Sequence, residues 1–159
     1  MPSMRNLVVE NIVNIFSTPN NPLIQPYVRV TREPLCEGDI SKLRYGEAIM
    51  YVIEGEESKT KQFSATAASL EIIVEVYYKP TLAEKDKNFP RISYKMNEIL
   101  AEVIKTVMEN KQFNATALNT VEISNRIDID GLYSETVNLE AIFLVTYRHG
   151  VKDPSVNMN

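Results

Sequence analysis

The residues best suited to catalysis in this sequence are its single histidine, His149, and its single cysteine, Cys36. A catalytic histidine needs a nucleophile or a carboxylate beside it, and a nucleophilic cysteine needs a base such as histidine. The chain offers only one histidine as a base and no evident nucleophile for it, so we interpret His149 as an exposed surface residue and Cys36 as an unreactive loop thiol. One cysteine also excludes an intramolecular disulfide and a multi-cysteine metal site.

Metal and phosphate motifs are also missing from the sequence. Asp128-Ile129-Asp130-Gly131 matches part of a calcium loop, but the further ligand positions and the terminal glutamate do not follow. The five glycines are scattered and form no phosphate-binding loop. The sequence therefore predicts no catalytic residues, no cofactor and no metal site, and we expect the protein not to be an enzyme. The alternative is a small ligand-binding or catalytic domain with a pocket under the loop at 33–46.

Acidic residues recur on the polar faces of the predicted strands. The set is Glu71, Glu75, Glu122, Asp128, Asp130 and Glu140. In one sheet they would form a largely acidic surface, relieved by Lys79, Arg126 and Arg148. This surface is either a solvated sheet face or a wall past which a polyanion slides without sticking, because like charges repel over a Debye length of ~10 Å.

Length and composition predict a single domain over residues 1–159, with a compact core at 4–148 and a loose tail at 149–159. The chain is 44% apolar and carries a net charge of -4, which argues against a basic surface for nucleic-acid binding. No apolar run approaches the ~20 residues that span a bilayer, and residues 1–17 lack the features of a signal peptide. We expect a cytosolic protein without membrane contact.

The central element is the segment Leu70–Lys79, in which apolar and polar residues alternate until Pro80. This period of two is typical of a half-buried strand. Similar alternation predicts strands at 27–32, 48–55, 121–129 and 138–148. Apolar residues at spacings of three and four predict amphipathic helices at 4–16, capped by Ser3, and at 90–110. The order predicts an α+β fold, with a mostly antiparallel sheet of four to five strands and both helices on one face.

In the order, length and residue pattern of these segments, the chain resembles the tail terminator (tail completion) proteins of long-tailed bacteriophages. The segments that carry the resemblance over residues 4–148 are Arg32–Ile40, Tyr51–Glu57, Ser69–Tyr77 and Asn138–Tyr147, with the single long helix between the last two. The resemblance implies a homo-oligomeric ring, usually a hexamer, that caps the tail tube and joins it to the neck. It implies tail tube and neck proteins as partners, DNA that passes without specific binding, and a place in the virion after assembly in the host cytoplasm. A head-completion or adaptor ring of the neck is the closest alternative.

Two charged segments, Glu33–Gly46 and the predicted polar turn Glu54–Lys61, contain few apolar anchors. We expect them to become ordered on assembly and to contact neighbouring subunits or the adjacent ring. The docking candidates in and beside them are Arg32, Glu33, Glu37, Asp39, Lys42, Arg44, Glu54, Glu56 and Glu57.

Overall fold

A computed structural model describes residues 1–17, 27–113, 116–129 and 135–159. Its elements, in chain order, are α1 (Met4–Ser17), β1 (Tyr27–Thr31), α2 (Glu37–Ser41), β2 (Ala48–Lys61), β3 (Ala65–Tyr78), α3 (Ile92–Glu109), β4 (Asn119–Asp128) and β5 (Val137–Gly150). The predicted α+β class is confirmed.

The strands form one five-stranded sheet in the order β1-β2-β3-β5-β4. Neighbouring strands are antiparallel except β1, which pairs with β2 in parallel, so the sheet is mixed. The predicted central strand corresponds to β3, which is paired along its length with β5. Because both edges of β3 are hydrogen-bonded, it lies in the interior of the sheet and only its two faces remain to be covered.

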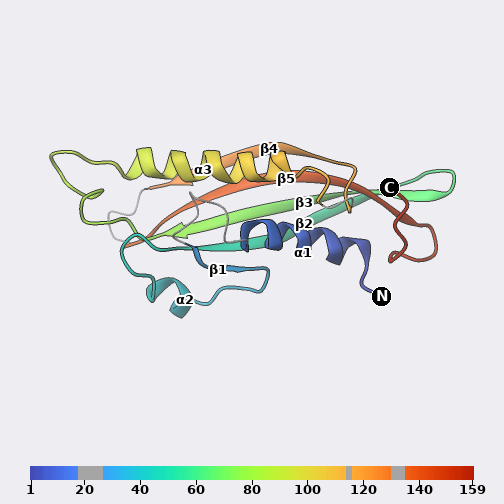
Figure 1. Ribbon diagram of the computed structural model, residues 1–159, viewed down its shortest axis with the longest axis horizontal. Helices are drawn as coiled ribbons and strands as arrows, with labels where there is room; N and C mark the ends of the chain where they lie inside the picture. Colours follow the sequence, from blue (N-terminus) through green and yellow to red (C-terminus); the bar gives the residue numbers. More distant parts are fainter. Residues whose placement is uncertain (18–26, 114–115, 130–134) are drawn as a thin grey trace.

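One face of the sheet is covered by α1 and α3, which lie over different parts of the strands in Figure 1. The burial of β3 and β5 alternates strictly, with buried residues such as Leu70, Val74 and Phe143 facing the helices. The helices supply the matching apolar stripes, for example Ile12 of α1 and Val103 of α3. Each such side chain contributes about 1.5–3 kcal/mol when fully buried. The opposite face of the sheet, which we call the open face, is only half-buried.

The hairpin of β2 and β3 is longer than the sequence predicts. The predicted polar turn Glu54–Lys61 is wrong, because β2 continues to Lys61 and the turn closes with a hydrogen bond from the Gln62 amide to the Ala65 carbonyl at 2.8 Å. Backbone pairing with β3 requires no apolar side chain, so a polar segment extends the strand as long as its side chains reach water. The hairpin projects beyond both helices, as Figure 1 shows.

The chain after β5 folds back on the domain, where the sequence predicts a loose tail. The Pro154 carbonyl accepts a hydrogen bond from the Met4 amide at 2.9 Å, and the Val156 carbonyl accepts one from the Gly150 amide at 3.0 Å. The first amides of a helix have no partner within the helix, so Pro154 satisfies one of these donors at the start of α1. The predicted cap of α1 is confirmed, with the Ser3 hydroxyl accepting from the Asn6 amide at 3.2 Å.

None of the helices in the described part of the chain is both long and apolar enough to cross a membrane.

Deleting residues 151–159 should destabilise the domain. The deletion removes the Pro154 acceptor and opens the covered end of β5, at a cost of about 2 kcal/mol. A chain of this size should then melt about 4–8 °C lower. Thermal unfolding followed by circular dichroism measures this shift, and Lys152→Ala, an exposed change in the same segment, is the control. An unchanged melting temperature in the truncated chain would show that these contacts contribute nothing to stability.

Candidate assembly surface

The open face of the sheet brings together most of the predicted acidic residues. Directly paired residues of neighbouring strands point to the same face, so the register defines rows across it. The rows are Val121, Leu144 and Glu71; Ser124, Ile142, Ile73 and Ile53; Arg126, Glu140, Glu75 and Tyr51; and Asp128, Asn138, Tyr77 and Ile49. Four of the predicted acidic residues thus share this face: Glu71, Glu75, Asp128 and Glu140.

Glu75 and Glu140 are directly opposite one another on β3 and β5. Two carboxylates in this position repel unless neighbouring groups relieve them. Arg126 of β4 lies directly opposite Glu140 in the strand register, and the Tyr77 hydroxyl donates a hydrogen bond to Glu75 at 2.8 Å. Burial, together with the Glu75 carboxylate, raises the pKa of Tyr77 to about 12. The tyrosine therefore stays protonated and keeps donating to Glu75 at neutral pH.

An apolar row interrupts the acidic surface, which corrects the expectation of a largely acidic face. Ile53, Ile73 and Ile142 lie in line across β2, β3 and β5 between the rows that contain Glu71 and Glu75. All three residues are half-buried, and no described helix covers them. The face is therefore an acidic surface with an apolar stripe.

Glu122 does not share the open face, contrary to the alternation in the sequence. A β-bulge lies between Glu122 and Ser124, and Glu122 is paired with Phe143, whose side chain faces the helices. The bulge makes Ile123 an extra residue and shifts the alternation by one position. The exposed Glu122 carboxylate accepts a hydrogen bond from the Asn125 amide group at 2.7 Å. Asp130 lies outside the described residues.

The outer edge of β4 has no strand partner among the described residues. It is ten residues long, and Val121 and Ile123 are 44% and 52% exposed. A long edge with apolar side chains is a template for pairing with another chain. At the opposite edge of the sheet, the short β1 exposes Val28.

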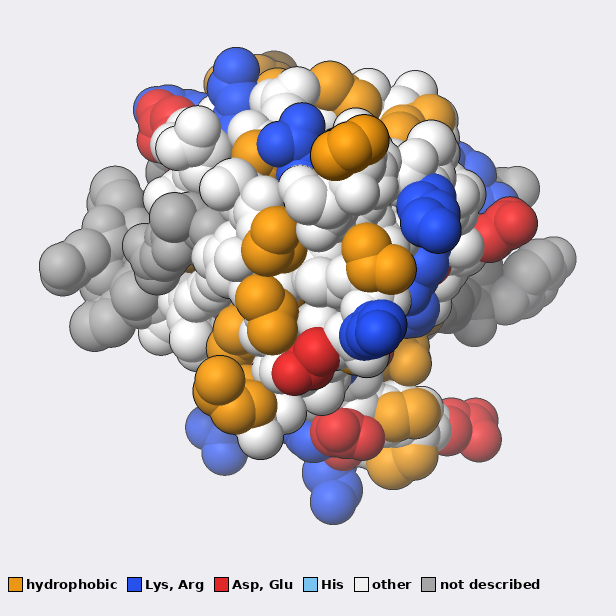
Figure 2. All heavy atoms as spheres, turned by 90° about the vertical axis from the view of Figure 1, so that its right-hand side faces the viewer, with side chains coloured by type: hydrophobic (Ala, Val, Ile, Leu, Met, Phe, Trp, Pro, Cys, Tyr) orange, Lys and Arg blue, Asp and Glu red, His pale blue; other side chains and the backbone are white. Residues whose placement is uncertain are grey.

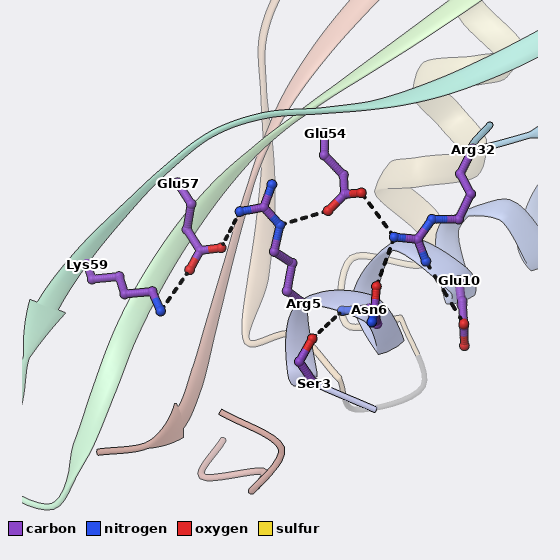
Figure 3. Close-up of polar contacts among 8 residues, drawn as sticks. All are labelled: Ser3, Arg5, Asn6, Glu10, Arg32, Glu54, Glu57 and Lys59. Atoms are coloured by element: carbon purple, nitrogen blue, oxygen red, sulfur yellow. Dashed lines mark hydrogen bonds and ion pairs between the residues drawn. The ribbon is translucent and has the colours of Figure 1, made fainter. Parts of the chain in front are cut away.

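Three of the predicted docking residues instead form a cluster of ion pairs that holds α1 against the sheet (Figure 3). The Arg5 guanidinium donates to Glu54 at 2.7 Å and to Glu57 at 2.9 Å, and Arg32 donates to the other oxygen of Glu54 at 3.0 Å. Lys59 reaches Glu57 at 3.3 Å. Glu54 and Glu57 are therefore strand residues beneath the start of α1 and do not lie at a hairpin tip. Glu56, between them, is exposed.

The loop at 33–46 contains the short helix α2, where the sequence predicts an irregular segment. Asp39 caps the helix by accepting hydrogen bonds from the Cys36 amide at 2.9 Å and from the Cys36 thiol at 3.1 Å. These hydrogen bonds hold the pKa of the Asp39 carboxyl below its ordinary value. The remaining docking candidates of this loop are at least partly exposed: Glu33, Glu37, Lys42 and Arg44. Their contact with a neighbouring subunit stays a prediction.

The interpretation of His149 as an exposed residue is wrong. Its residue exposure is only 4%, because the side chain alternates onto the helix-facing side at the end of β5 and the C-terminal segment pairs with it through Asn157. Cys36 is exposed, as predicted for a loop thiol. Within the described ranges, no group of three or more His, Cys, Asp or Glu side chains is arranged to hold a metal ion.

No protein-family model matches this chain, and a search of curated proteins found no match.

Glu54→Gln should destabilise the fold more at neutral pH than at acid pH. Burial alone would raise the pKa of Glu54, but hydrogen bonds from Arg5 and Arg32 outweigh it and lower that pKa below 4.5, its ordinary value. The ionised carboxylate thus stabilises the fold above pH 4.5, and this contribution is lost as the pH falls through the lower pKa of the folded state. Because the cluster is partly exposed, solvent screening limits the loss to about 1 kcal/mol.

Urea unfolding at neutral pH and near pH 3 measures this difference. The matched control is Glu56→Gln, an exposed carboxylate on the same strand. Equal stability of the two variants at neutral pH would contradict a structural role for the Glu54 pairs.

Proposed function

We propose that this chain is the subunit of a phage tail terminator ring, which ends the tail tube, joins it to the neck and passes DNA through a central channel. The observation that carries the proposal is a sheet with both long helices on one face, an acidic open face and a long edge that has no strand partner among the described residues. The virion is the corresponding location, and tail tube and neck proteins are the corresponding partners.

The directions of the strands support a ring built by continuing the sheet from one copy to the next. β1, β2 and β5 run in one direction, and β3 and β4 run in the other. A second copy placed beside the first in the same orientation would therefore bring its β1 antiparallel to the free edge of β4. This contact joins two different edges, and such head-to-tail contacts close into rings when the rotation between copies allows it.

The carboxylates of the open face support an arrangement with this face toward the channel. Its carboxylates, Glu71, Glu75, Glu140 and Asp128, would be repeated in every subunit around DNA. Repulsion of phosphates by repeated carboxylates reduces sticking, and the isoleucine stripe offers DNA phosphates no hydrogen-bond donor. The helices would then face outward, with exposed residues such as Glu98 and Tyr94 in contact with water or with neighbouring rings.

Replacing both Val121 and Ile123 by lysine should prevent ring assembly. Charges on an edge strand oppose pairing with another strand, while these exposed positions can accept them without unfolding the domain. Sedimentation with purified tail tubes, and light scattering of the protein alone, measure assembly. Tyr94→Lys is the control, because Tyr94 is 60% exposed and belongs to α3, not to the edge strand.

Wild-type protein should cap tube ends, and the double variant should not. Binding only to portal complexes would favour the adaptor ring of the neck. A strictly monomeric wild-type protein that never binds tubes would contradict the proposal.

Exchanging Glu75 and Glu140 for lysine should turn the assembled ring into a DNA-binding ring. Each substitution replaces a carboxylate on the open face by a cation, so phosphate repulsion becomes attraction that weakens with salt. Retention of double-stranded DNA by assembled rings at low and high salt measures the effect. The control is the same charge change at Glu98 and Glu109 on the outward side of α3. Equal retention by both variants would mean that the open face does not face the DNA.

A further inference from the structure

A polar cavity of about 350 Å³ lies apart from the open face, at the end of the domain where both chain termini are found. It is lined by Ser3 and Arg5 of the α1 start, Glu57 and Lys59 of β2, Tyr147 and His149 of β5, and Pro154. Its volume lies within the range of small-molecule sites, ~300–1,000 Å³. Figure 2 views this end of the molecule and shows lysine and arginine side chains among apolar ones.

His149, one of the residues that line the cavity, has an unused hydrogen-bond acceptor. Its Nδ1 lies 2.8 Å from the Gly150 carbonyl oxygen, which can only accept, so Nδ1 carries the proton. In the neutral ring Nε2 is then an acceptor, and this buried atom has no hydrogen-bond partner among the described residues. Buried polar atoms nearly always have a hydrogen-bond partner, so we expect Nε2 to accept a hydrogen bond from an O–H or N–H group of a ligand.

Arg5 and Lys59 make the lining of the same cavity cationic. The carboxylate in the lining, Glu57, already accepts from Arg5 at 2.9 Å and lies 3.3 Å from the Lys59 ammonium. The Tyr147 hydroxyl also hydrogen-bonds Glu57, and burial with this carboxylate raises the pKa of Tyr147. An ammonium has three N–H donors and a guanidinium has five, so both cations retain the capacity to bind an anion. The lining thus carries two cations against one anion in a chain of net charge -4.

We propose that this cavity binds inorganic phosphate in its hydrogen phosphate form. The ligand must donate one hydrogen bond to His149 Nε2 and present negative oxygens to Lys59 and Arg5. Hydrogen phosphate does both, because it keeps one P–OH group at neutral and slightly alkaline pH. Sulfate has the same shape and charge but no proton, and the diester phosphates of DNA also lack one. The site therefore distinguishes phosphate from sulfate and from the DNA backbone.

Nuclear magnetic resonance of the full chain tests the proposal directly, because His149 is the only histidine and its ring signals need no further assignment. Titration with sodium phosphate at slightly alkaline pH should shift these signals saturably. Sulfate should bind about tenfold or more weakly, the loss expected when one hydrogen bond to a charged group is missing. A phosphomonoester should also bind weakly there, because its second pKa of about 6 leaves it without a proton.

Lys59→Met should abolish the phosphate response, whereas Lys61→Met, the same charge change two residues along β2 and outside the cavity lining, should keep it. Both lysines are exposed, so neither change should unfold the domain. Three results would overturn the proposal: no shift of the His149 signals, an equal response to sulfate, or equal loss in the two lysine variants.

Discussion

The structure depends on one constraint, the position of β3 in the interior of the sheet. Both edges of this strand are hydrogen-bonded, so its alternating side chains must meet something on each face. On one face Leu70, Val74 and Val76 are buried and belong to the apolar core that α1 and α3 complete. On the other face Glu71, Ile73 and Glu75 meet no described helix. The asymmetry between a core face and an open face follows from this single strand.

Polar contacts at the start of α1 fix the position of this helix along the sheet. Apolar residues such as Val8 and Ile12 bury the helix but do not fix its position along the strands, because apolar packing is not directional. Arg5 adds direction, since its guanidinium bridges Glu54 and Glu57 across the bulge of β2. The C-terminal segment then accepts the Met4 amide. The result is a preformed polar corner where α1, the long hairpin and the C-terminus meet.

The alternation in β3 and β5 and the apolar stripe of α3 made the sheet, its open face and the long helix predictable from the sequence. Glu71, Glu75 and Glu140 were predictable for the same reason. The alternation of side chains along β4 was not predictable, because the bulge at Ile123 depends on pairing with β5. This bulge moves Glu122 to the helix-facing side. The polar half of β2 was also missed, since its strand is maintained by backbone hydrogen bonds. His149 was misjudged because its burial arises partly from the returning C-terminal segment.

We propose that copies of this chain form a closed ring with the open face toward a channel. The most direct measurement is a cryo-electron microscopy reconstruction of the protein bound to the end of a tail tube. We expect a ring in which β4 of each copy pairs with β1 of the next, the carboxylates of Glu71, Glu75 and Glu140 line the channel, and α3 lies on the outside. A ring whose channel is lined by α1 and α3, or a complex in which the edge of β4 remains in solvent, would contradict it.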